Sequence, residues 1–284
     1  MNYDCTPIFV EQLELSFKFF MRFTVLTTTY NRAHILGRVH ESLCAQTFRD
    51  FEWLIVDDGS TDGTKDLVSS WKPFFPIRYF WKPNGGKHTA MNLGVSVAGG
   101  EFALFFDSDD RCIPKTLERF DYHWRQIPNP SRFANLSCLC CSPDGSIVGK
   151  PYPAVCVDAF TFTEQLRYRS CERWGINRTD VLREFPWPEG ERFVPEGLVW
   201  NRISRKYAAR FFNEPLRIYY EDGLDSLSRK NDRRASSPKS AMAYYRELAL
   251  SPAPILLRLR AVINYCRFAA HAAFRKYGFR SQSA

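Results

Sequence analysis

Two short apolar runs in this chain of 284 residues each end directly in aspartates. The five carboxylates are those of Asp57, Asp58, Asp107, Asp109 and Asp110. A single aspartate at such a place usually caps the next helix, but carboxylates crowded together repel one another unless a cation compensates them. Asp107 and Asp109 are spaced so that both can offer oxygen ligands to Mg²⁺ or Mn²⁺ while leaving coordination positions for phosphates. The pattern therefore indicates a site for a divalent metal and a phosphate-bearing ligand.

Apolar runs and amphipathic segments alternate from residue 21 to about residue 126, and these elements must position the aspartates. The expected strands cover residues 23–27, 51–56, 77–80 and 102–106, and the expected helices cover residues 35–46, 64–71 and 88–97. Strands that alternate with helices of about ten residues form crossover units in a mostly parallel sheet. The carboxyl ends of the strands line the ligand crevice of such a sheet. Both aspartate clusters are therefore expected at one edge of one sheet.

The alternation loosens after Gln126. We expect a strand at 135–142, a strand or short helix at 158–169, loops broken by prolines up to residue 215, a basic linker at 226–240 and an amphipathic helix at 252–277. The sequence thus predicts an α/β domain at residues 21–225. An extension at 1–20 precedes this domain, and a basic linker with a C-terminal helix follows it at 226–284.

The formal net charge of +8 is unevenly distributed. Residues 251–284 carry six basic side chains and no acidic one, residues 226–250 carry six basic and two acidic ones, and the remaining body is therefore near −2. A nucleic-acid-binding domain would carry a basic stripe on its folded body, so no nucleic acid is expected as a partner. A helix at 252–277 with Arg260 and Arg267 on one side and apolar residues on the other fits an anionic membrane surface. The alternative is an ordinary helix that packs its apolar side on the domain.

Other functions suggested by short motifs fail on spacing. Residues 58–63 imitate the start of an EF-hand loop, but its twelfth position holds Ser69 where a bidentate glutamate is required. Residues 85–87 lack the first glycine and the hydroxyl residue of a phosphate-binding P-loop. No G-x-G-x-x-G follows the first strand, which argues against a dinucleotide cofactor. No serine lies in a nucleophile elbow.

Four segments resemble the motifs of family-2 glycosyltransferases of the GT-A fold. They are Thr27-Thr-Thr-Tyr-Asn-Arg32, Val56-Asp-Asp-Gly-Ser-Thr-Asp-Gly-Thr64, Asn84-Gly-Gly-Lys87 with Asn92, and Asp107-Ser-Asp109. Their order and spacing agree with the family over roughly residues 22–114. The resemblance implies a Rossmann-like, mostly parallel sheet with helices on both faces, here with a C-terminal helical extension. It makes 21–114 the nucleotide-sugar half and 115–225 the acceptor half of the catalytic domain.

The resemblance also implies roles for individual residues. The implied nucleotide-sugar-binding side chains are Thr28, Tyr30, Arg32, Asp57, Asp58, Lys87, Asn92, Asp107 and Ser108. The first three would border the nucleotide base, and Asp57 or Asp58 would accept a hydrogen bond from it. Asp107 would face the ribose or the metal, and Asp109 would ligate the metal.

Members of the family use a catalytic base in the second half, commonly in an acidic pair. Glu196 stands at the place of that pair, and Gly197 replaces the second acid. The rival acids are Asp180, Glu189 and Glu191. Trp200 would either cover the acceptor sugar with a ring face or belong to the core. No Q-x-x-R-W sequence follows, which argues against a processive polymer synthase of that type.

The resemblance therefore predicts an inverting glycosyltransferase that moves a sugar from a nucleotide-diphosphate sugar to a saccharide or lipid-linked acceptor with help from Mn²⁺ or Mg²⁺. The alternatives are a non-catalytic nucleotide-sugar-binding module and a nucleotidyltransferase. Nine cysteines without zinc-finger spacing and a first segment unlike a signal peptide favour the cytoplasm. If the basic tail binds lipid, the protein lies at the inner face of the membrane.

Overall fold

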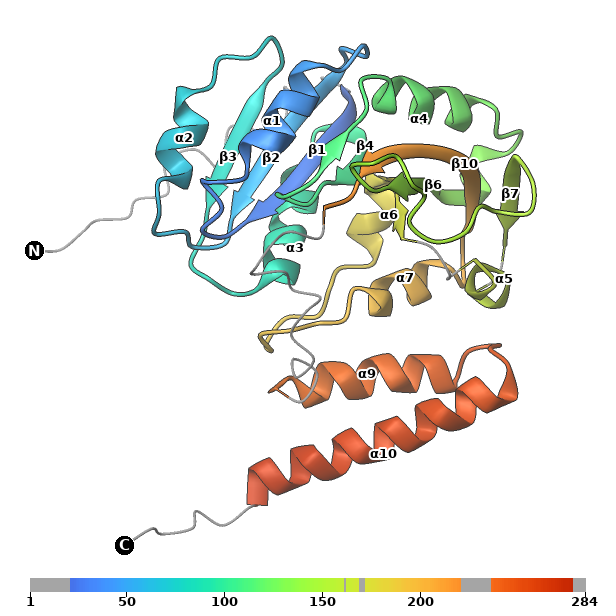
Figure 1. The fold of residues 1–284 in the computed structure, drawn as a ribbon. Helices are drawn as coiled ribbons and strands as arrows, with labels where there is room; N and C mark the ends of the chain where they lie inside the picture. Colours follow the sequence, from blue (N-terminus) through green and yellow to red (C-terminus); the bar gives the residue numbers. More distant parts are fainter. Residues whose placement is uncertain (1–20, 161, 169–171, 221–235, 278–284) are drawn as a thin grey trace, which may run out of the picture.

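A computed structural model describes residues 21–160, 162–168, 172–220 and 236–277 (Figure 1). The strands are β1 (Met21–Thr29), β2 (Phe51–Asp57), β3 (Ile77–Trp81), β4 (Gly100–Phe105), β5 (Arg111–Cys112), β6 (Phe133–Cys141), β7 (Cys156–Ala159), β8 (Arg173–Trp174), β9 (Ile176–Arg178) and β10 (Ala208–Ile218). The helices are α1 (Gly37–Cys44), α2 (Thr64–Ser70), α3 (Lys87–Val97), α4 (Thr116–Arg125), α5 (Phe162–Leu166), α6 (Thr179–Glu184), α7 (Gly197–Ile203), α9 (Pro238–Ala249) and α10 (Ile255–Tyr277). The strands and helices expected up to residue 106 are all present within a few residues of their predicted bounds.

Within the described ranges the strands form one sheet in the order β3-β2-β1-β4-β9-β6-β10-β5, with β7 beside β10 and β8 beside β6. The long neighbours β1, β2, β3 and β4 are parallel, as are β6 and β10. The short strand β9 is antiparallel to both β4 and β6 and joins the two parallel groups. The mostly parallel sheet predicted from the sequence is thereby confirmed.

Helices cover both faces of this sheet (Figure 1). Successive side chains of a strand point to opposite faces, so the apolar strands present side chains to the helices on both sides. Phe51, Trp53 and Ile55 of β2 pack in one cluster with buried residues of α1, α2 and α4. Leu54 and Val56 of the same strand pack in a second cluster with α3, α6 and α7. Truncating a buried ring such as that of Trp53 to alanine is expected to cost about 3–5 kcal/mol of unfolding free energy.

The strand register places the two aspartate clusters at the same edge of the sheet. Thr29 at the end of β1 lies opposite Asp57 at the end of β2. On the other side of β1, Leu26 lies opposite Phe105, so that Asp107 follows just beyond the end of β4. The parallel arrangement expected from the sequence thus brings both clusters to one carboxyl edge.

The C-terminal part of the chain forms a separate layer of two helices, α9 and α10, next to α7 (Figure 1). The sequence predicted a linker through residue 240, but a helix already begins at Pro238. Proline suits the first turn of a helix, because its missing N–H has no partner there in any case. The helix expected at 252–277 is confirmed by α10. The predicted extension at 1–20 and most of the predicted linker lie outside the described residues.

Candidate active site

The turn after β2 is held together by its own aspartates. Asp57 is fully buried, and its carboxylate accepts hydrogen bonds from the backbone N–H of Ser60 at 2.7 Å and from the hydroxyl of Tyr79. Burial together with the neighbouring Asp57 charge raises the pKa of Tyr79 well above its usual value, so its hydroxyl stays a donor. In this conformation the Asp57 carboxylate faces the protein interior.

Asp58 shapes the loop that leads to α3. Its carboxylate accepts hydrogen bonds from the backbone N–H groups of Gly85 and Gly86 at 2.9 and 2.8 Å, and it pairs with Lys82 Nζ at 2.6 Å. Gly86 has φ of +100°, and a Cβ added there would lie 2.7 Å from the carbonyl oxygen of Arg192. Only glycine meets both demands. The loop therefore ends in a fixed place and presents Lys87 as the first residue of α3.

Lys87 joins the two halves of the domain. Its Nζ atom lies 2.9 Å from Asp107 Oδ1, beyond the end of β4, and 2.9 Å from Glu196 Oε1, at the start of α7. Burial alone would lower the pKa of Lys87, but the charges of Asp107 and Glu196 raise it well above its usual value. The Asp107 and Glu196 side chains remain 40% and 45% exposed, so a ligand can reach both carboxylates.

Arg217 of β10 is the second cation on Asp107, and our sequence analysis did not identify it. Its Nη2 atom lies 2.8 Å from Asp107 Oδ2, and its guanidinium pairs with Asp110, with Nε at 2.7 Å. Glu172 lies 3.9 Å away on the more exposed side. Burial alone would lower the pKa of Arg217, but Asp107 and Asp110 raise it, so the guanidinium stays charged. A buried arginine needs a carboxylate partner, but β10 also contains Arg210, Asn213 and Glu214, so the sequence did not single out Arg217.

Glu172 is a further acid that the sequence analysis did not assign to the site. Burial raises its pKa; the nearby Arg217 lowers it, and Asp107 and Glu196 raise it further. It comes from the segment just before β8. The site thus collects carboxylates from three separate segments around two basic side chains.

Asp109 is the carboxylate of this turn that the protein compensates least. Burial and the adjacent Asp107 charge raise its pKa, and its cationic partner in the described structure is Arg32, 3.7 Å away. A partly buried carboxylate short of positive charge fits a divalent cation as its missing partner. Within the described ranges no group of three or more His, Cys, Asp or Glu is arranged to hold a metal. The assignment of Asp107 and Asp109 as metal ligands stays a prediction.

The remaining residues predicted to contact the nucleotide lie along the same edge. Thr28 pairs in register with Val56 near the end of β1, and Tyr30 is largely exposed just beyond it. Ser108 is buried in the turn between Asp107 and Asp109. The loops after β1 and β2 are bound to each other, because Asn31 N–H donates to Ser60 Oγ at 2.8 Å. These positions agree with the predicted nucleotide contacts, which stay predictions.

Asn92 is not part of the cluster around Lys87. Its amide donates to Trp187 O and to Glu189 Oε1, both at 2.8 Å, and its Oδ1 accepts from Trp187 N–H. Glu189 is therefore occupied as a loop contact. Glu191 accepts hydrogen bonds from the first backbone N–H groups of α9, and Asp180 pairs with Arg178. Of the four acids proposed as catalytic base, Glu196 is the one that contacts Lys87 of the cluster.

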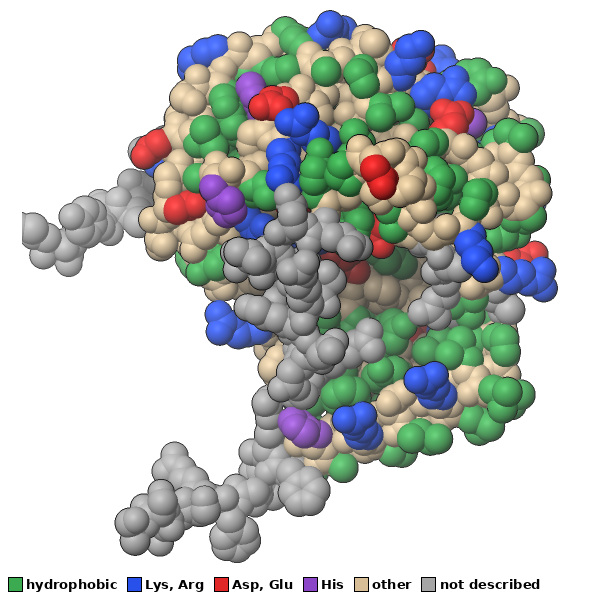
Figure 2. Space-filling model, viewed as in Figure 1, with side chains coloured by type: hydrophobic (Ala, Val, Ile, Leu, Met, Phe, Trp, Pro, Cys, Tyr) green, Lys and Arg blue, Asp and Glu red, His purple; other side chains and the backbone are tan. Residues whose placement is uncertain are grey.

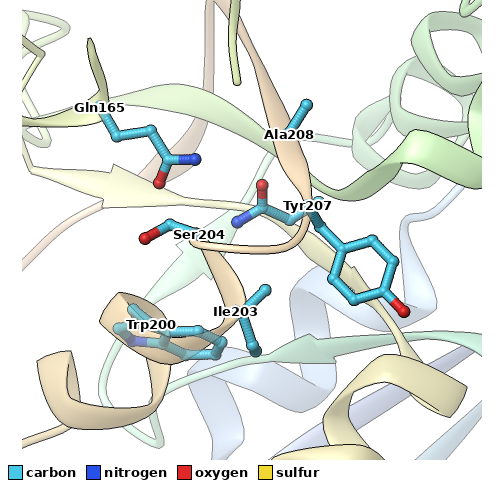
Figure 3. Close-up of a pocket in the computed structure, with 7 residues that line it drawn as sticks. Gln165, Trp200, Ile203, Ser204, Tyr207 and Ala208 are labelled. Carbon is cyan, nitrogen blue, oxygen red and sulfur yellow. The ribbon is translucent and has the colours of Figure 1, made fainter. Parts of the chain in front are cut away.

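Trp200 lies one turn after Glu196 and packs edge-on against Phe105 and Trp187. Its ring also forms one wall of a small hollow, shown in Figure 3. The lining residues are Asn135, Gln165, Trp200, Ile203, Ser204, Tyr207 and Ala208. Asn135 Oδ1 is buried there without a hydrogen-bond partner. The two predicted alternatives for Trp200, core and ligand contact, are therefore both compatible with its position.

Comparison with known proteins relates this architecture to sugar transfer. Residues 24–129 match the profile of Glycosyl transferase family 2. An uncharacterized glycosyltransferase of Nostoc sp. is 39% identical over 101 residues, which cover 35% of this chain and 31% of that protein. The GalNAc(5)-diNAcBac-PP-undecaprenol beta-1,3-glucosyltransferase of Campylobacter jejuni is 34% identical over 103 residues, 34% of this chain and 32% of the relative. The matched stretch thus spans about a third of the length of these relatives.

Two solved structures share the fold over nearly the whole chain. TarS residues 1–349 of S. aureus, in complex with UDP-GlcNAc, superposes with a TM-score of 0.68 at 20% identity, covering 93% of this chain and 76% of that one. The mannosyltransferase PcManGT of Pyrobaculum calidifontis, in complex with GDP-Man and Mn²⁺, gives a TM-score of 0.55 at 19% identity, with 92% and 77% coverage. At this level of identity the likeness concerns the fold, and it extends beyond the matched residues 24–129 into the second half of the domain.

Proposed function

The chain is a member of glycosyl transferase family 2, and from that premise we propose that it transfers a sugar from a nucleotide-diphosphate sugar to an acceptor hydroxyl with inversion at the anomeric carbon. The observation that carries the proposal is the position of Lys87, 2.9 Å from both Asp107 and Glu196. A donor-side carboxylate and a candidate base from different halves of the domain share one cation. They therefore lie close enough to act on one bond.

The donor side consists of the edge formed by β1, β2 and β4. Its exposed Tyr30 ring offers a face for a nucleotide base. Asp109, with Asp107 beside it, is the place for Mn²⁺ or Mg²⁺, since burial and the Asp107 charge leave it short of positive charge. When bound, such a cation stabilises the negative charge that develops on the leaving diphosphate. Lys87 and Arg217 hold Asp107 in position, and Lys87 is placed to contact the diphosphate as well.

The acceptor side requires a base, because a sugar hydroxyl is a weak nucleophile at neutral pH. Glu196 takes this role: its carboxylate accepts the proton of the acceptor hydroxyl while the hydroxyl oxygen forms a bond to the anomeric carbon. The bond from that carbon to the diphosphate oxygen breaks on the opposite side, so a nucleoside diphosphate leaves. In the structure Glu196 pairs with Lys87, and an incoming acceptor would replace part of this contact.

The acceptor we propose is a saccharide, free or linked to a lipid. Trp200 supports this choice, because it is only partly buried one helical turn after Glu196 and an aromatic ring face suits a sugar ring. The relative from Campylobacter jejuni acts, by its name, on an undecaprenol-linked saccharide. A lipid-linked acceptor would place this protein at the inner face of a membrane, and among the described helices none is long and apolar enough to cross one.

The proposal is tested by product analysis with a panel of donors that includes UDP-GlcNAc and GDP-mannose, the ligands of the two structural neighbours. Metal-stimulated release of a nucleoside diphosphate is expected with at least one donor. Release of pyrophosphate from a nucleoside triphosphate and a sugar phosphate would instead establish a nucleotidyltransferase. Tight donor binding with no turnover for any acceptor would establish a non-catalytic binding module.

A further inference from the structure

The helix α10 buries one narrow side against α9. Ala261 is buried and Leu257 is partly buried in a small cluster with Leu248 of α9, and the Phe268 ring stacks on Tyr245 at a centroid distance of 5.7 Å. Leu257, Ala261 and Phe268 follow one another at helical spacing on one side of α10. This side of α10 thus packs on α9, whereas the alternative predicted from the sequence was packing on the domain at 21–225.

The helix α9 is in turn fixed to the element that carries the proposed base. Glu247 of α9 pairs with Arg205 at 2.9 Å and with Arg202 at 3.4 Å, just beyond and within α7. The Tyr244 ring lies so close to Gly197 that a Cβ at this glycine would meet it at 3.2 Å. The layer of α9 and α10 therefore forms one body with the helix that begins after Glu196.

A second apolar side of α10 points away from α9. Five large aliphatic side chains form this outer stripe: Ile255, Leu256, Leu259, Val262 and Ile263. Leu256 is 77% and Ile263 is 69% exposed. At about 100° per residue, the centre of this stripe lies opposite the buried Ala261. Large exposed apolar patches on soluble proteins mark interaction sites, and within the described residues this stripe has no covering element.

The surroundings of the outer stripe decide which partner suits it. Arg260 and Arg267 lie along one side of it, and Arg258 lies toward the other. All three are exposed, and the Arg258 Nε atom also donates to Ala249 O at 2.9 Å. Residues 251–284 contain no acidic side chain, and Figure 2 shows basic and hydrophobic side chains side by side on this layer. A second copy of the same surface would bring like charges together.

We propose that the outer stripe of α10 docks on a membrane surface that contains anionic lipid. The aliphatic side chains would enter the interface between head groups and acyl chains, and the flanking arginines would contact lipid phosphates, as in interfacial amphipathic helices. Because α9 connects α10 to α7, docking would hold the Glu196 end of α7 near the membrane. This consequence rests on the proposed transfer to a lipid-linked acceptor, whereas the docking itself does not.

The test uses the full chain and sedimentation with vesicles of phosphatidylcholine alone or with about one third phosphatidylglycerol. We expect binding to the anionic vesicles at low salt and release at high salt, because surface charges are screened. Leu259→Glu/Ile263→Glu should lower the binding constant by more than about 100-fold, since two aliphatic side chains lose their burial. Arg260→Gln/Arg267→Gln should lower it by about 25-fold, at about fivefold per arginine.

The matched control is Val155→Glu/Phe74→Glu, which makes the same charge change at exposed apolar positions on the sheet domain and should bind vesicles like the unmodified chain. Unchanged binding of the α10 variants, or no binding of the unmodified chain at low salt, would overturn the proposal. The proposal would also be overturned if light scattering showed the unmodified chain as a dimer and the α10 variants as monomers, since the outer stripe would then bind a second copy. With a water-soluble acceptor, sugar transfer measured as release of nucleoside diphosphate should be equal in all variants. If neither the unmodified chain nor any variant released nucleoside diphosphate, that result would count against the proposed function alone.

Discussion

The turns after β2 and β4 begin alike, with an apolar strand that runs into aspartates, but their positive partners differ. Asp58 finds two backbone N–H groups and one lysine within the next 28 residues. Asp107 relies on Lys87 and on Arg217, a residue of the last strand, while Asp109 has Arg32 at 3.7 Å. The first turn is thus complete as a piece of structure. The second leaves carboxylate oxygens that a ligand can use.

The largest effect is expected for Asp109→Ala. Turnover should fall to background, by about 10³-fold or more, because the proposed cation site loses a ligand and the leaving diphosphate loses its charge compensation. Donor affinity, measured by calorimetry, should no longer respond to Mn²⁺ or Mg²⁺. Full metal-stimulated activity in this variant would show that the turn after β4 does not hold the metal, and would contradict the difference proposed between the two turns.

Glu196→Gln should lower turnover by about 10²-fold while donor affinity stays nearly unchanged, because the amide keeps the shape and loses the proton acceptor. The matched control is Glu191→Gln, five residues earlier, where the carboxylate holds the start of α9. That control should affect thermal stability more than turnover. If donor affinity of Glu196→Gln falls in parallel with turnover, Glu196 has a structural role.

Arg217→Met tests whether the second turn depends on a distant cation. Removing the guanidinium leaves the buried Asp110 without its cation, which should cost about 3–5 kcal/mol of unfolding free energy. Turnover should fall by about 10-fold or more, since Asp107 loses one of the two contacts that orient it. Because this variant is destabilised, Arg217→Lys is measured beside it. Lysine should recover part of the stability but less of the turnover, because it cannot contact both carboxylates in the same geometry.

The smallest effect is expected for Lys82→Met in the first turn. Asp58 keeps its two backbone N–H partners, so the unfolding free energy should fall by only about 1–2 kcal/mol. Turnover and metal response should stay within about twofold of the unmodified chain. Chemical denaturation and donor kinetics measure both quantities. A loss of turnover as large as that of Arg217→Met would show that the first turn belongs to the catalytic machinery.

The local elements could be predicted because each depends on neighbours in the sequence. The continuous apolar run at residues 53–56 specifies a buried strand, and the adjoining glycines and aspartates specify a turn. Which aspartate stays reactive could not be predicted, since the partners of Asp107 come from residues 87 and 217. Lys87 lies in one of the four motif segments of the sequence, whereas Arg217 lies outside them.

The second half of the domain and the C-terminal layer show the same limit. The acceptor-side order of β9, β6 and β10 depends on long-range strand pairing, for which the loose pattern after Gln126 contained no signal. The helix α10 was predicted from its periodicity, but one apolar face was expected and two are present. A single helix cannot reveal that a second helix, here α9, will cover one of them.

The central claim is that Glu196 deprotonates an acceptor hydroxyl that attacks the donor sugar directly. The measurement that tests it most directly is the anomeric configuration of the product formed from an α-configured nucleotide-diphosphate sugar, read by proton NMR. A single displacement inverts that carbon, so a β-linked product accompanied by nucleoside diphosphate is expected. An α-linked product would contradict the account, because retention does not arise from one displacement assisted by Glu196.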